Sequence, residues 1–140
     1  MGQINIWLYL SAYGLVLTRR QKMAQITITW EAFGNRPEAN RFISSATLEL
    51  NGVWNQISNT VLLESIYTAT NLKSELKDFG YAPLLIELWE TIEKVLPANR
   101  THTSLSVGDK IQINRSAASI ENEDGATYTV ADAGFELVGA

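Results

Sequence analysis

The segment between Pro83 and Pro97 restricts the possible folds most, because it has the clearest helical period in the chain. Its large apolar residues recur every three or four positions and therefore form one stripe on a helix. Pro83 suits the first turn of that helix, and Pro97 cannot continue it. Such a stripe must be covered, so we expect the helix to pack on a sheet and to bury its central residues. Those residues are Leu88, Trp89 and Ile92.

Other segments alternate with a period of two, which is typical of strands with one buried face. Residues 25–30 are rich in β-branched side chains and place Ile26, Ile28 and Trp30 on one face. Residues 46–50 precede Asn51-Gly52, and this dipeptide between two apolar runs predicts a hairpin whose second arm is 53–57. The remaining predicted strands are 110–114, 127–130 and 134–138.

Two further helical segments lie between these strands. Ser58, Asn59 and Thr60 can each cap a helix that begins near residue 61 and ends near residue 71. Residues 73–79 predict a short additional turn of helix that Gly80 stops. Together with the strands, they predict an α+β fold with an antiparallel sheet or a partial barrel packed against two helices.

The chain of 140 residues has the usual size of one domain, which we expect to span residues 23–140. Residues 1–22 are a separate question, because an apolar run from 4 to 17 is followed by Arg19, Arg20 and Lys22. The run is shorter than a membrane-spanning helix needs. The three interpretations are upstream sequence read in frame before Met23, a packed N-terminal strand or helix, and a weak membrane anchor.

The composition excludes several chemistries. The chain has no cysteine, which removes thiolate nucleophiles, disulfides and sulfur ligands for metals. His102 is the only histidine, and we expect it to be a solvated polar side chain of a loop. Residues 121–125 are similar to a calcium loop but lack its terminal glutamate. We therefore expect no metal and no cofactor.

The charge is uneven along the chain and bears on the type of partner. Residues 1–22 hold three of the 11 basic residues and no acid, so the remainder carries eight basic and 15 acidic residues, a net charge of −7. Binding to phosphate backbones needs clustered Lys and Arg, so nucleic acid is disfavoured. We expect a cytoplasmic protein with a protein partner and without firm membrane association.

The loop 99–109 joins the helical part to the last strands and has two interpretations. In the structural one, Leu105 anchors the loop while Ser and Asp side chains hydrogen-bond the backbone of its turn. Gly108 then needs a positive φ. In the functional one, the polar side chains form a surface that grips a partner. These candidate partner-binding residues are Arg100, His102, Ser104, Ser106 and Asp109.

Three features in order suggest a family. They are an extended segment from Gln25, the pattern Leu-Glu-Ser-Ile-Tyr at 63–67 with Asn71, and the run Ser-Leu-Ser-Val-Gly-Asp at 104–109 before a strand and a final Gly134-Phe135. This order resembles the small YodL-like proteins found on bacterial plasmids, phages and integrated elements. The resemblance covers about residues 25–138, although residues 73–93 are more helical and the loop 115–125 is longer than in the family. It implies an accessory protein of a mobile element and brings no catalytic residues.

Three functions remain open at this point. The first is a non-enzymatic interaction protein with a protein partner. The second is a small nucleic-acid-binding module in which Trp54, Tyr128 and Phe135 stack on bases. The third is an enzyme of an unrecognised type, which would require a pocket lined by Asp109, His102 and a buried carboxylate.

Overall fold

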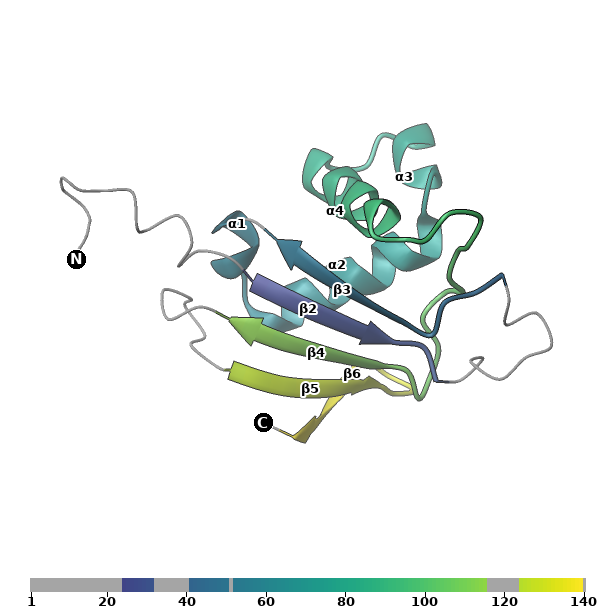
Figure 1. Ribbon diagram of the computed structural model, residues 1–140. Coiled ribbons are helices and arrows are strands. Elements are labelled where there is room, and N and C mark those ends of the chain that lie inside the picture. Colours follow the sequence, from purple (N-terminus) through teal and green to yellow (C-terminus); the bar gives the residue numbers. More distant parts are fainter. Residues whose placement is uncertain (1–23, 32–40, 51, 116–123, 140) are drawn as a thin grey trace, which may run out of the picture.

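Five antiparallel strands form one open sheet in the order β3-β2-β4-β5-β6 (Figure 1). The computed structural model describes residues 24–31, 41–50, 52–115 and 124–139. The predicted extension 1–22, the segment 33–40, whose Gly, Asn and Pro residues predict a turn, and most of the connection 115–125 lie outside these residues. The strands are β2 (Ala24–Thr29), β3 (Ser45–Leu50), β4 (Lys110–Arg115), β5 (Asp124–Val130) and β6 (Phe135–Gly139).

The two inner strands, β2 and β4, carry the apolar face that the alternation predicts. Ile26 lies opposite Leu48 of β3 on one side and opposite Ile113 of β4 on the other. All three side chains are fully buried. The opposite face carries Thr, Gln and Asn side chains, so the sheet has one covered and one polar face.

Four helices follow the strand β3 and the first of them begins directly after it. They are α1 (Gly52–Asn55), α2 (Asn59–Leu72), α3 (Glu75–Asp78) and α4 (Pro83–Lys94). Helix α2 lies across the apolar face of the sheet, and α4 lies beside α2 and near β3 (Figure 1). The predicted α+β class with an antiparallel sheet is confirmed. Across the described part of the chain, no helix has the length and apolarity needed to cross a bilayer.

Helix α2 begins directly after Ser58, one of the three predicted capping residues, and ends at Leu72, close to the predicted end near residue 71. The Ser58 side chain accepts a hydrogen bond from the Val61 backbone N–H at 3.3 Å, and the stripe residues Leu62, Leu63 and Ile66 are buried in the core. An N-cap of this kind contributes about 1 kcal/mol. The helix therefore forms from local signals and is fixed by its apolar stripe.

In α4 the prediction holds for two of the three central residues. Leu88 and Ile92 are fully buried, whereas Trp89 is only half-buried and the expectation of its burial is wrong. Trp89 lies at the border of the stripe, where α3 covers it incompletely. The Lys77 ammonium group stands 5.5 Å from the centre of the indole ring and also pairs with Glu90 at 3.2 Å.

The predicted hairpin at Asn51-Gly52 is also wrong, because Gly52–Asn55 is helix α1. Trp54 and Asn55 are consecutive and both buried, which a strand with alternating faces does not allow. Arg115 of β4 holds this turn: its guanidinium donates to the carbonyl oxygens of Trp54 (3.1 Å), Asn55 (3.0 Å) and Ile57 (2.7 Å). Hydrogen bonds between residues about 60 positions apart in the chain thus decide that this segment is a helix, which the Asn51-Gly52 dipeptide alone does not predict.

Candidate functional site

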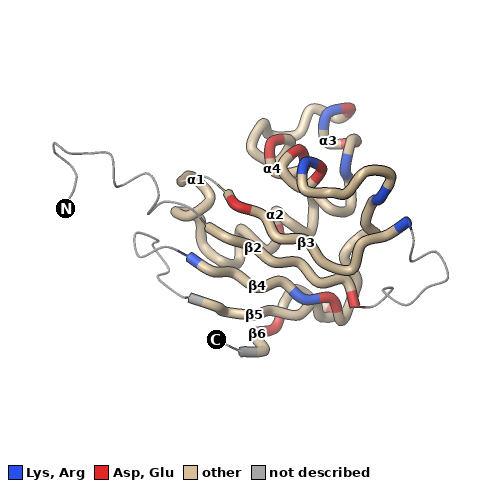
Figure 2. Tube along the Cα trace, in the orientation of Figure 1, with Lys and Arg blue, Asp and Glu red and all other residues tan. Residues whose placement is uncertain are grey.

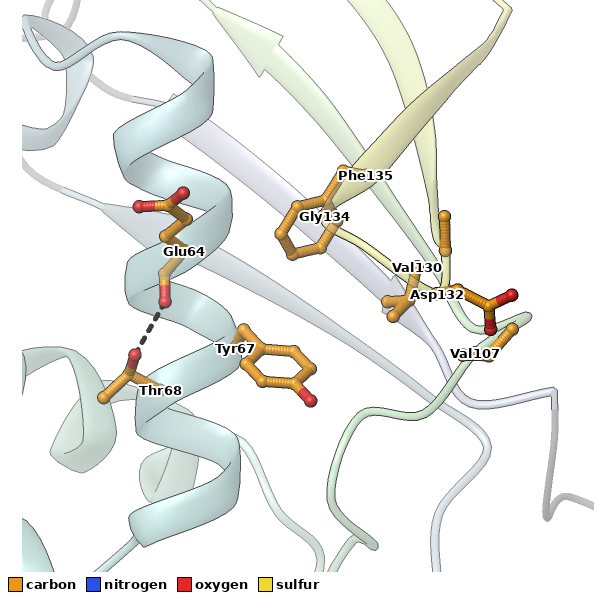
Figure 3. A pocket seen from close by; sticks show the side chains of 9 residues that line it. Glu64, Tyr67, Thr68, Val107, Val130, Asp132, Gly134 and Phe135 are labelled. Atoms are coloured by element: carbon orange, nitrogen blue, oxygen red, sulfur yellow. Dashed lines mark hydrogen bonds between the residues drawn. The ribbon is translucent and has the colours of Figure 1, made fainter.

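A pocket of about 420 Å³ lies between helix α2 and the β5–β6 hairpin (Figure 3). One wall is α2, which contributes Glu64, Tyr67 and Thr68. These three lie away from the buried stripe of the helix, so they face the pocket and the solvent. The Thr68 hydroxyl donates to the Glu64 backbone carbonyl at 2.9 Å and leaves the Glu64 carboxylate for contacts outside the helix.

The opposite wall is the end of β5 and the beginning of β6. Ala131 donates its N–H to the Gly134 carbonyl at 2.9 Å, and Gly134 has a φ of 85°, a conformation that favours glycine. This tight turn directs Phe135 back towards α2. The Phe135 and Tyr67 rings meet edge to face, with centroids 6.2 Å apart and planes at 87°.

The loop 99–109 closes one end of the pocket through Val107. The turn at Ser106–Asp109 is built as the structural interpretation predicts. The Asp109 carboxylate accepts from the Ser106 N–H at 2.8 Å, and the Asp109 N–H donates to the Ser106 carbonyl at 2.9 Å. Gly108 has a φ of 100°, which confirms the predicted positive value. This turn leaves Val107 at the tip of the loop with 56% of its surface exposed.

His102 lies in the core of the loop, so the expectation of a solvated side chain is wrong. Its ring stacks on Trp30 with centroids 5.0 Å apart and planes at 19°. The Nδ1 atom lies 2.8 Å from the Thr103 carbonyl oxygen, which can only accept, so Nδ1 carries the proton. Burial lowers the pKa of His102, and this effect outweighs the opposing hydrogen bond to Thr103.

The five candidate partner-binding residues do not form one accessible surface. His102 and Asp109 are buried, Ser106 is half-buried, and Arg100 and Ser104 are exposed. Arg100 donates from Nη2 to the Phe42 carbonyl at 2.9 Å, which ties the loop to the segment before β3. The buried anchor Leu105 is confirmed. The predicted loop thus reaches the pocket through Val107, which the polar pattern did not single out.

The chemistry available in the pocket is limited. Its titratable side chains are Glu64, Tyr67 and Asp132, and the two carboxylates lie on opposite walls (Figure 3). Neither Asp109 nor His102 lines the pocket, so the constellation expected for an enzyme is not assembled there. Within the described ranges, no group of three or more His, Cys, Asp or Glu residues could hold a metal ion.

The aromatic residues considered for base stacking also lie on the covered side of the sheet. Trp54 is buried, while Tyr128 and Phe135 are half-buried and pack against the core. The Tyr128 hydroxyl lies 2.9 Å from the Asn59 side-chain amide, inside the network of Arg115. The described residues of the polar face include no aromatic side chain. Stacking platforms of the kind that single-stranded nucleic acids use are therefore not displayed there.

Comparison of the chain with models of protein families, with curated proteins and with solved structures found no match. The resemblance to the YodL-like proteins stays a prediction. The aromatic pair of this site, Tyr67 and Phe135, belongs to elements that the periodicity predicts. Their meeting is a property of the tertiary structure.

Proposed function

We propose that the chain is a non-enzymatic interaction protein that binds a protein partner at the flank formed by α2, β6 and the tip of the loop 99–109. The observation that carries the proposal is the exposure of apolar side chains in and beside a pocket that has an aromatic pair. Leu137, which shares the face of Phe135, is 61% exposed. Val107 and Tyr67 line the pocket close by and are also exposed. An accessible apolar patch rimmed by polar residues is typical of interaction sites.

The shape of the site supports a protein partner. The pocket offers an aromatic pair, Tyr67 and Phe135, together with two carboxylates at its walls. Such a hollow takes one anchoring side chain of a partner, and the surrounding rim excludes water from that contact. The absence of Asp109 and His102 from its lining gives the enzyme hypothesis no comparable support.

Site-specific photo-cross-linking in the native host tests this function. A benzophenone amino acid replaces Leu137 in one variant and Val95 in a matched control, because Val95 is an exposed apolar residue at the end of α4. We expect the Leu137 variant to form one discrete protein adduct that the Val95 variant does not form. A second change, Tyr67→Ala, should weaken that adduct. Equal labelling at both positions, or no adduct at Leu137, would contradict the proposal.

A further inference from the structure

Strand β6 forms one edge of the sheet, and the helices cover its side chains less than those of the opposite edge strand. Among the described residues it pairs only with β5, as the order β3-β2-β4-β5-β6 requires. The other edge strand, β3, buries Ala46, Leu48 and Leu50 beneath the helices. On β6, by contrast, Leu137 stays largely exposed. The helix layer therefore ends before the sheet does.

The hydrogen bonds of Val130 show which backbone groups of β6 point outwards. The Val130 N–H donates to the Asp109 carbonyl, and its own carbonyl accepts from the Gly108 N–H, both at 2.9 Å. Both groups of Val130 are thus used on the side away from β6. Phe135 lies directly opposite Val130, so this is a pair without mutual hydrogen bonds. The N–H and carbonyl of Phe135 therefore face the free edge, and by alternation those of Leu137 do too.

The side chains on this edge define what an added strand would meet. Phe135 and Leu137 lie opposite Val130 and Tyr128, so they share the apolar face of the sheet. Glu136 lies between them, is exposed and points to the polar face. A residue paired with Phe135 would place its side chain in the pocket, and one paired with Leu137 would cover that leucine. The residue between them would stand next to Glu136.

The charge of this flank is of one sign. Glu64 is the only charged residue of α2. The described side chains of the β5–β6 hairpin that carry a charge are Asp132 and Glu136. The described basic residues, blue in Figure 2, lie instead on α3, α4, β4 and the loops between elements. The basic residues of an incoming segment would therefore meet carboxylates of opposite charge, and no described basic side chain of the β5–β6 hairpin would repel them.

We infer that the partner binds as a sixth strand on the free edge of β6, through an extended segment in which apolar and basic residues alternate. This inference rests on the proposed function and names the partner's chemistry. The backbone of the segment pairs with Phe135 and Leu137, which is strand addition to a sheet edge. One apolar side chain enters the pocket that Tyr67 and Phe135 line. The next apolar side chain covers Leu137, and the basic residue between them pairs with Glu136.

Selection from a displayed library of random heptapeptides on the full chain tests this inference. The expected consensus has apolar residues at alternate positions with Lys or Arg between them. A synthetic peptide of that consensus should lose roughly tenfold or more in affinity when the amide that bonds to Phe135 is N-methylated, because the hydrogen bond is lost. Methylation of the neighbouring amide, which faces away from β6, should change affinity about twofold at most.

Protein variants test the charge of Glu136, with a matched control on β3, and the apolar contact at Leu137. Glu136→Lys should weaken the peptide severalfold and favour a peptide with acids in place of the basic residues. Glu49→Lys on the opposite edge strand β3, where Glu49 is also exposed, should have no effect. Leu137→Ala should weaken binding without changing the melting temperature much, since the side chain is already exposed.

The outcomes separate this inference from the proposed function. Peptides that bind but tolerate both methylations, or a consensus without alternation, would overturn strand addition and leave the protein-binding proposal standing. If the selection enriches no peptide but the cross-linking gives a discrete adduct at Leu137, strand addition is likewise overturned and the protein-binding proposal stands. Pairing of β6 with a second copy, seen as a dimer by sedimentation that Leu137→Ala abolishes, would also overturn it. Failure of both the selection and the cross-linking would refute both proposals.

Discussion

Replacement of Arg115 by methionine should destabilise the fold strongly, because this buried side chain holds helix α1 and the start of α2 to the sheet. Its guanidinium donates to the carbonyls of Trp54, Asn55 and Ile57, and Nε donates to the Asn59 side-chain oxygen at 2.9 Å. Methionine keeps much of the apolar stem and removes all the donors. The variant therefore isolates the polar part of the interaction.

The expected magnitude follows from the number of bonds and the burial of their acceptors. Each hydrogen bond from a charged donor contributes about 1.5–3 kcal/mol, so four bonds added naively would exceed about 6 kcal/mol. The contributions are not additive, and the half-buried Ile57 can regain water. A buried acceptor left without a donor costs about 1–3 kcal/mol, so loss of the whole network should cost about 3–5 kcal/mol. We expect Arg115→Met to lower the free energy of unfolding by that amount, and Arg115→Lys to lower it by about 2 kcal/mol, because lysine lacks the planar fork.

Urea denaturation followed by tryptophan fluorescence measures these differences. Lys110→Met is the matched control, because Lys110 lies on the same strand and makes an ion pair with Glu31 at 3.0 Å in which both side chains are well exposed. Such a pair contributes at most about 1 kcal/mol. If Arg115→Met loses no more than Lys110→Met, the buried network does not stabilise α1 and the reasoning is refuted.

Three further results are expected. Gly108→Val should lower the free energy of unfolding by more than about 1 kcal/mol, and Gly108→Ala by nearly as much, because φ is 100° while an added Cβ would meet no atom within 4 Å. Equal stability of Gly108→Ala and the wild type in thermal melting would show that the turn is not strained. Asp109→Asn should cost less than about 1 kcal/mol because its amide oxygen still accepts from the Ser106 N–H, whereas Asp109→Leu should cost more. His102 has a lowered pKa in the folded state, so stability should be complete above its unfolded pKa of about 6.5 and fall as the pH decreases through that value. Lys73 and Glu93 also act on the pKa of His102, and His102→Phe, which retains an aromatic ring, should remove this pH dependence from the denaturation curves.

Local patterns in the sequence predict most of the helices and strands of this protein. Alternation places Ile26, Ile28 and Ile113 on the buried face, and the Ser58 cap together with a stripe of period 3.6 defines α2. The positive φ of Gly108 follows from turn chemistry in the same way. Each of these depends on neighbours within a few residues, so a pattern in the chain suffices to predict it.

Tertiary structure alone decides the rest, because burial and pairing depend on residues far apart in the chain. Asn51-Gly52 suits a hairpin, but β3 pairs with β2 and Arg115 captures the carbonyls of the next turn. The polar loop around His102 predicts a solvated side chain, but the ring of Trp30 stacks on His102 and covers it. The candidate site likewise arises where α2, the loop tip at Val107 and the edge strand β6 meet, and no local pattern records that meeting. Local patterns thus predict most of the helices and strands, whereas long-range packing decides helix α1 and which side chains remain exposed.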